Sequence, residues 1–396
     1  MPYDRRSMEA PKPWSTVRDR NGTVYEGLNF ATSDYLGLAT HPKVKGAAVA
    51  AIQRFGTHSA ATAALAGMTD EADALALALG KALHQPYVSL HSSGWAAGYD
   101  AMRAFVRPGD AVLLDAHIGS GIFQGASAAT RHVYTYRHLD LDHALAWMRK
   151  LRARRAHTAL FVATSSVFAG DGACSDLSAL QPLCQEFDAT LAVDVAHDFG
   201  CVGPRGGGEI EVQSVLGKID LVVGSLAKTL ASNGGFIATR QADLRDYARA
   251  FSPTHVFSAA LGPAQIAAAG AALSLVESPE GASRRAALRR TVLALRASLS
   301  EYHLAPIGTP GPIVAVPIGA EFLARETVRL CSERGVLLNL LEYPAAPRGK
   351  ARVRLQPMAG HEPALMPEVA AKIAESVCAA QHANRRKTFL STLDRI

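Results

Sequence analysis

The sequence predicts an α/β fold: a large, mostly parallel sheet with helices on both faces, followed by a smaller C-terminal α+β domain. Three observations support it. Short apolar runs recur through the middle of the chain, and such runs are typical of strands buried on both faces of a sheet. Several of them alternate with segments of helical pattern, as expected when crossover helices join parallel strands. From about Gly281 the pattern changes, which marks a second domain.

Six apolar runs are the expected strands of the large sheet, and they lie at 87–90, 111–114, 159–162, 191–193, 221–223 and 236–238. The segments 141–154 and 177–187 are expected helices between them. After 281 we expect a long Ala/Leu/Arg helix, strands around 313–316 and 352–355, and a helix over 367–379. The predicted division is an N-terminal arm over 1–45, a large domain over 46–280 and a small domain over 281–396.

Composition limits the class of protein. The 396 residues are 48% hydrophobic and include 33 glycines, which is typical of a globular protein. The five cysteines are widely spaced, so we expect neither a metal site nor a disulfide framework. No run approaches the roughly 20 apolar residues of a membrane span, and the N-terminus has no apolar signal segment, so we expect a cytoplasmic protein.

The net charge of +6 includes two basic runs, at 149–155 and 385–387. Such runs are usually solvated faces, and the alternative is an anionic partner such as coenzyme A or an acidic carrier protein. No motif interleaves aromatic residues with these charges, so no nucleic-acid partner is expected.

Three polar residues follow expected strands, where catalytic groups of such sheets gather: Asp115, Asp194 and Lys228. Lys228 lies in the stretch VVGSLAKTLASNGGF, just after an apolar run. A lysine amine can form a Schiff base with an aldehyde cofactor, and an aspartate can keep a pyridine nitrogen protonated. Lys228 and Asp194 are 34 residues apart, about one strand–helix–strand unit. The hydroxyl of Ser225 can hold a phosphate.

Several motifs, in order, resemble one family, from about Phe30 to His361. They are SDYLGL at 33–38 with HP at 41–42, SSGW at 92–95, DVAH at 194–197 with Gly200, GPRG at 203–206, GSLAK at 224–228, FS at 257–258 and ARVRL at 351–355 with His361. The chain thus resembles the α-oxoamine synthases of the fold-type I pyridoxal-phosphate enzymes. The resemblance implies a homodimer with shared active sites and a fold-type I transferase.

The resemblance also implies a role for each matching residue. Lys228 would be the Schiff-base lysine and later proton-transfer base, Asp194 would pair with the pyridine nitrogen, and His197 would contact the 3-hydroxyl of pyridoxal phosphate. The phosphate pocket would be lined by Ser93, Gly94, Trp95 and Ser225, with Ser258 reaching the phosphate of the partner subunit. Arg354 would hold the amino-acid carboxylate, and Arg352, on the same face of a regular strand, is the alternative.

The sequence departs from the family pattern at four positions. Gly119 stands where the family has a histidine that stacks on the cofactor, and Val195, Ala169 and Ala63 replace polar residues. Either His117 takes the stacking place after a two-residue shift of the turn, or Gly119 leaves that face open. We favour the open face, because the ungapped match keeps Ile122 and Gly125 in register.

The predicted function is the decarboxylative condensation of a small amino acid with an acyl thioester, carried by coenzyme A or an acyl-carrier protein, to give an α-aminoketone. Other carbanion reactions of the same cofactor, namely aldol cleavage, racemisation and transamination, stay open. A catalytically weak scaffold subunit is a further alternative, which the missing histidine favours and the intact Lys228, Asp194 and Arg354 oppose.

Overall fold

The computed structural model describes residues 3–154 and 157–393, and it divides into two compact units. The smaller unit comprises Met1–Thr40, Gly170–Ala173 and Ser283–Ile396, and the larger unit comprises His41–Ala169 and Cys174–Ala282. The three-part division expected from the sequence stays a prediction.

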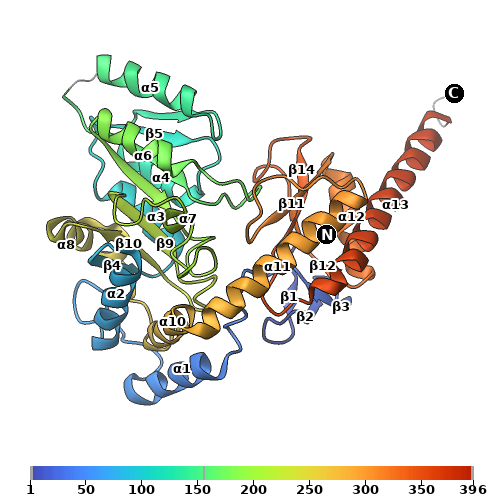
Figure 1. Ribbon diagram of the computed structural model, residues 1–396, viewed down its shortest axis with the longest axis horizontal. Helices are drawn as coiled ribbons and strands as arrows, with labels where there is room; N and C mark the ends of the chain where they lie inside the picture. Colours follow the sequence, from blue (N-terminus) through green and yellow to red (C-terminus); the bar gives the residue numbers. More distant parts are fainter. Residues whose placement is uncertain (1–2, 155–156, 394–396) are drawn as a thin grey trace. The chain divides into compact units, whose positions relative to one another are not determined.

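The larger unit is built on a seven-stranded sheet, which confirms the α/β fold class (Figure 1). Its strand order is β4-β10-β9-β8-β7-β5-β6. The strands are β4 (Tyr87–His91), β5 (Ala111–Asp115), β6 (Val133–Tyr136), β7 (Leu160–Ser165), β8 (Ala189–Asp194), β9 (Leu221–Ser225) and β10 (Gly235–Thr239). β10 runs antiparallel to β4 and β9, and the pairs from β9 to β6 are parallel.

The helices of the larger unit connect these strands and cover the sheet. They are α1 (Pro42–Phe55), α2 (Asp70–Leu83), α3 (Gly94–Arg103), α4 (Ser120–Ala129), α5 (Leu141–Arg154), α6 (Leu177–Glu186), α7 (Glu209–Val212), α8 (Ala242–Phe251), α9 (Pro253–Phe257) and α10 (Pro263–Val276). Both expected helices are present, as α5 and α6. The six expected apolar runs form β4, β5, β7, β8, β9 and β10.

Burial explains why these strands could be predicted from apolar runs in the sequence. Every residue of β5, β7 and β10 is buried, so their sequences are almost continuously apolar. On one face of the sheet, Val112 and Leu114 of β5 pack with Met102 of α3 and Ile122 of α4 in a single apolar cluster. Successive strand residues point to opposite faces, so Leu113 must be covered from the other side. This packing fixes α3 and α4 on the sheet.

The smaller unit holds two sheets. One has the order β1-β2-β3-β12 and the other β11-β14-β13. The strands are β1 (Arg6–Ser7), β2 (Trp14–Arg18), β3 (Val24–Asn29), β11 (Val314–Gly319), β12 (Val336–Leu337), β13 (Asn339–Leu341) and β14 (Ala351–Leu355). The helices are α11 (Pro279–Glu301), α12 (Glu321–Glu333), the short 3₁₀ helix η1 (Pro363–Leu365) and α13 (Met366–Leu393). The sequence predicted β11, β14, α11 and α13 but not the first sheet.

The structure bears on two further expectations, which concern membrane spans and the two basic runs. Within the described ranges, no helix has both the length and the apolar content that crossing a bilayer requires. In the basic run at 149–155, Arg152 is a structural residue, since it donates to the carbonyls of Phe187 at 2.6 Å and Thr158 at 2.8 Å. Arg155 lies outside the described residues, and so do the side chains of the run at 385–387.

Candidate active site

A cavity of about 220 Å³ lies in the larger unit, where the carboxyl ends of β7, β8 and β9 meet the N-termini of α3 and α4. The helix N-termini supply backbone N–H groups that no helical carbonyl uses, and the strand ends supply side chains. The lining residues are Gly94, Trp95, Gly98, His117, Gly119, Ser120, Gly121, Ile122, Ser165, Val167, Ala169, Asp194, Ala196, His197, Ser225 and Lys228.

Lys228 and Asp194 enter this cavity from neighbouring strands. Asp194 is the last residue of β8, and Lys228 lies three residues beyond the end of β9. The loop that carries Lys228 is folded back tightly, since Leu226 donates its N–H to the carbonyl of Gly234 at 2.9 Å. Gly234 has a φ of 111°, a conformation that glycine adopts without strain. The glycine pair after Lys228 therefore fixes the lysine at the strand end.

Burial controls the charge of Asp194. It raises the pKa of this carboxyl, while the ammonium of Lys228 and the N–H of Ala196, which donates to Oδ1 at 2.9 Å, act in the opposite direction. The charged form of a buried carboxylate is stabilised by any further cation that lies close to it. Asp194 is thus suited to hold a proton on a basic ring nitrogen that enters the cavity.

The N-terminus of α3 borders the cavity and presents groups of the kind that bind anions. Ser93 is its N-cap, and its hydroxyl accepts from the N–H of Ala96 at 3.0 Å. Gly94 lies directly against the end of β9, because a Cβ at Gly94 would be 2.6 Å from the Cβ of Ser225. The hydroxyl of Ser225 and the first N–H groups of α3 therefore lie side by side, which is an arrangement that binds a phosphate.

The N-terminus of α4 approaches the same place. Gly121 permits it, because a Cβ there would be 2.5 Å from the carbonyl oxygen of Trp95. The indole N–H of Trp95 donates to the hydroxyl of Ser120 at 3.1 Å. Gly119 differs from Gly121: its φ of −58° suits any residue, and a Cβ would meet only Asp194 Oδ2, at 3.5 Å. A side chain at position 119 would thus point toward Asp194.

The cavity brings together most of the residues predicted from the sequence. It is lined by Lys228, Asp194, His197, Gly94, Trp95, Ser225, Gly119 and His117. Ser93 is not among its lining residues, because its hydroxyl caps α3. Ser258 follows α9 and donates its hydroxyl to the carbonyl of Thr254. Arg352 and Arg354 lie on β14 of the smaller unit.

The structure also shows polar residues that the sequence analysis missed. Ser120 and Ser165 line the cavity. Asp198 is fully buried behind it, and accepts from the hydroxyl of Ser166 at 2.5 Å and from the N–H of Glu209 at 2.6 Å. Burial raises the pKa of Asp198 to about 7. The sequence pointed to Asp198 only through its position four residues after Asp194. In the structure, Asp198 holds the loop that carries His197.

Comparisons with known proteins identify the family of the chain. The family model described as "Aminotransferase class I and II" matches residues 25–373. The chain is 33% identical over 337 residues to the 8-amino-7-oxononanoate synthase of Geobacter sulfurreducens, covering 85% of each. It is 31% identical over 345 residues to the 2-amino-3-ketobutyrate coenzyme A ligase of Salmonella typhimurium, covering 86% of each.

Solved structures show the same fold. A serine palmitoyltransferase of Sphingomonas wittichii superposes with a TM-score of 0.89 and 22% identity, over 96% of this chain and 94% of that one. The 8-amino-7-oxononanoate synthase of Francisella tularensis gives a TM-score of 0.74 at 22% identity, over 89% and 98%.

Proposed function

Because the chain belongs to the α-oxoamine synthase family of fold-type I pyridoxal-phosphate enzymes, which are C-acyltransferases, we propose that it joins a small amino acid to an acyl thioester. Carbon dioxide leaves, and the product is an α-aminoketone. The thioester carbonyl forms the new bond to the amino-acid Cα, and its bond to sulfur breaks to release the thiol. The thiol belongs to coenzyme A or to an acyl-carrier protein.

The cavity fits pyridoxal phosphate. Its volume of about 220 Å³ holds one small ring compound, with Lys228 and Asp194 available to its polar groups and the N-terminus of α3 available to its phosphate. When bound, this cofactor withdraws electrons from the amino-acid Cα and stabilises a carbanion there. The residues that line the cavity are the groups such chemistry needs.

Three side chains carry the chemistry in this proposal. Lys228 would hold the cofactor through its amine, and the same amine would accept the proton from the amino-acid Cα. Asp194 holds the proton on the pyridine nitrogen, with its own charge favoured by that cation. His197, which lines the cavity beside Asp194, contacts the ring hydroxyl.

Further residues would bind the cofactor and the substrate. Gly94, Trp95 and the hydroxyl of Ser225 hold the phosphate, with Ser93 fixing the helix start as its cap. Arg354 holds the amino-acid carboxylate with two parallel hydrogen bonds. We further propose a cytoplasmic homodimer in which Ser258 reaches the phosphate bound by the partner subunit. Trp95 is 47% exposed and Phe257 86% exposed in the single chain, and a second subunit would cover such side chains.

The observation that carries the proposal is the pairing of Lys228 and Asp194 in one cavity against the N-terminus of α3. The test is Lys228→Ala, with Lys218→Ala as the matched control on an exposed lysine ten residues earlier. The wild type should hold the cofactor as a borohydride-reducible lysine adduct with visible absorbance. Lys228→Ala should lose both that absorbance and turnover, and the control should keep them. A reducible adduct on another lysine in Lys228→Ala protein would refute the assignment.

Product analysis tests the reaction itself. The holoprotein is incubated with glycine, alanine or serine and a panel of acyl-CoA and acyl-carrier thioesters, and products are identified by mass spectrometry. An α-aminoketone together with free thiol and carbon dioxide is expected. Thioester-independent products, such as a keto acid, an aldehyde or the opposite enantiomer, would instead support one of the other carbanion reactions.

A further inference from the structure

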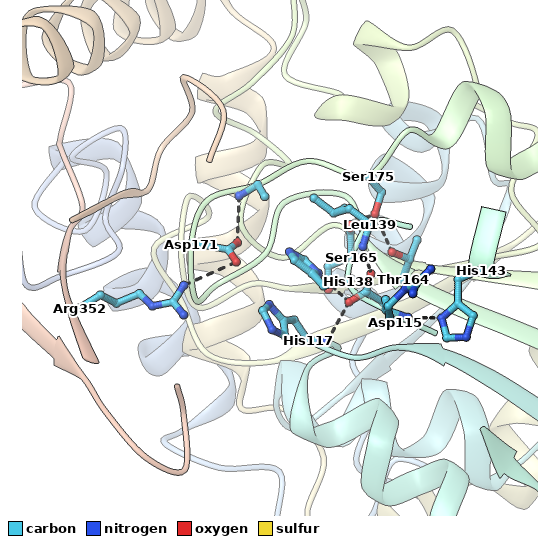
Figure 2. A network of polar contacts seen from close by, with 12 residues as sticks. Asp115, His117, His138, Leu139, His143, Thr164, Ser165, Asp171, Ser175 and Arg352 are labelled. Atoms are coloured by element: carbon cyan, nitrogen blue, oxygen red, sulfur yellow. Dashed lines mark hydrogen bonds and ion pairs between the residues drawn. The ribbon is translucent and has the colours of Figure 1, made fainter. Parts of the chain in front are cut away.

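A buried carboxylate organises one wall of the active-site cavity. Asp115 ends β5, is fully buried, and accepts three hydrogen bonds (Figure 2). Its Oδ1 accepts from the N–H of His117 at 2.7 Å and from Nδ1 of His138 at 2.8 Å, and its Oδ2 accepts from the N–H of Leu139 at 2.9 Å. Asp115 thus fixes the turn after β5 and the turn after β6 to each other.

His138 is held on three sides. Besides the bond to Asp115, its ring lies edge-on to the buried ring of Phe168, with centroids 4.5 Å apart and planes at 89°. Its ring also stacks on His117, with centroids 3.9 Å apart and planes at 23°. The carboxylate accepts only from a protonated ring nitrogen, so the bond selects the Nδ1–H form of His138. The orientation of His138 therefore helps to fix where the ring of His117 lies.

His117 faces the cavity that Lys228 and Asp194 also line. Its exposed ring comes from the turn between β5 and α4, and α4 still begins at Ser120. The helix therefore needs no shift of register for an imidazole to border the cavity. The space beside Asp194 stays open at Gly119, so the ring of His117 is a separate part of the wall.

We propose that His138, held by Asp115, is a positioning residue that fixes His117 as a wall of the pyridoxal-phosphate cavity. His138 acts only through His117, since its own ring lies behind that of His117 and is not among the lining residues. The proposal rests on the proposed function only for the identity of the cofactor. It concerns cofactor retention, so it stands or falls separately from the condensation reaction.

The experiment measures the rate at which pyridoxal phosphate leaves the holoprotein, followed by absorbance after dilution. His117→Ala and His138→Ala should each speed release about three- to tenfold, the range of a single aromatic contact. The double variant should release no faster than either single variant, because the two residues act as one unit. His143→Ala is the control: its ring accepts from the N–H of Arg137 at 2.9 Å and does not line the cavity.

Additive effects in the double variant would overturn the proposal, as would wild-type release from His138→Ala. If His138→Ala does not fold, His138→Asn replaces it, because an amide still donates to Asp115 while the stacked ring is lost. Release as slow as wild type from His138→Asn would also overturn the proposal. A protein that shows the expected release rates but makes no aminoketone would refute the proposed reaction and leave this inference standing.

Discussion

The two arginines of β14 differ in burial. Arg352 is buried, and its Nη1 lies 3.3 Å from the carbonyl oxygen of Gly170 and 3.6 Å from Oδ2 of Asp171. Figure 2 shows this guanidinium turned toward Asp171. Arg354 is half-buried; burial lowers the pKa of its guanidinium, and Tyr35 acts in the opposite direction. A substrate carboxylate at Arg352 would compete with Asp171, which counts against Arg352 as the carboxylate-binding residue.

Arg354→Ala should weaken amino-acid binding by about two orders of magnitude, because a charge-assisted bidentate contact contributes about 3 kcal/mol. The measurement is a spectral titration of the holoprotein with the amino acid. Cofactor content should not change. Arg352→Ala is the matched control and should lower stability, since it leaves Asp171 without its ion pair. Equal losses of affinity in both variants would contradict the assignment.

Some residues of the site could be predicted from the sequence, and others could not. Asp194 and Lys228 follow apolar runs that form the neighbouring strands β8 and β9, so the parallel sheet brings them together. His138 follows β6, whose sequence VYTY is only partly buried and does not read as a core strand. Its connection to the cavity passes through the side chains of Asp115 and His117, and such contacts leave no periodic signal.

At the scale of elements, a buried polar network joins β4, α3 and α9. His91, the last residue of β4, bonds through Nδ1 to Oδ2 of Asp100 on α3 at 3.0 Å, and its Nε2 lies 3.1 Å from the hydroxyl of Ser89. The hydroxyl of Thr254 on α9 donates to the same carboxylate. His91, Asp100 and Ser89 are all buried. The network links α3, whose N-terminus borders the cavity, to the segment before Ser258.

Asp100→Ala should lower the free energy of unfolding by about 3 kcal/mol, because it leaves buried donors on His91 and Thr254 without their acceptor. Urea denaturation measures the change. Asp142→Ala is the control, an exposed residue in the first turn of α5, and should cost under about 1 kcal/mol. A cost for Asp100→Ala no larger than that of the control would show that the network does not stabilise the fold.

Some strands could be predicted from the sequence and others could not. Strands buried on both faces appear as apolar runs, so β5, β7 and β10 could be predicted. β2 has exposed residues at both ends, β3 has exposed residues only in its first half, and β12 has only two residues. β3 pairs with β12 at Leu28 and Val336, far apart in the chain. A Cβ at Gly27 would lie 2.1 Å from the carbonyl of Gly335, and this close approach is invisible in a single sequence.

At the scale of the whole molecule, each unit contains a buried histidine that resists protonation. In the smaller unit, His361 accepts from the N–H of Met358 at 2.9 Å and stacks on Phe30 at 4.4 Å. Burial lowers its pKa to about 4, while the carbonyl of Pro13 acts in the opposite direction. In the larger unit, burial lowers the pKa of His255 to about 4, and the charges of His91 and Arg249 add to this effect.

These shifts set the direction of the pH dependence. Between about pH 4 and the pKa of about 6.5 of an exposed histidine, the unfolded chain binds protons that the folded chain does not. Each histidine therefore contributes up to about 3 kcal/mol of stability above pH 6.5, and this contribution is lost as the pH falls toward 4. Asp198 has the opposite effect, because its raised pKa of about 7 makes the folded chain bind the extra proton in the same window.

Because these effects oppose each other, the wild-type curve alone does not isolate a histidine, but the difference from a variant does. His361→Gln keeps a donor and an acceptor and cannot titrate. We expect its unfolding free energy, measured in urea from pH 4 to 7, to fall less steeply with acid than that of the wild type. The two curves should therefore converge toward pH 4. His382→Gln, at an exposed position of α13, should run parallel to the wild type. A constant offset for His361→Gln across this range would mean that His361 stabilises the smaller unit by packing and hydrogen bonding alone.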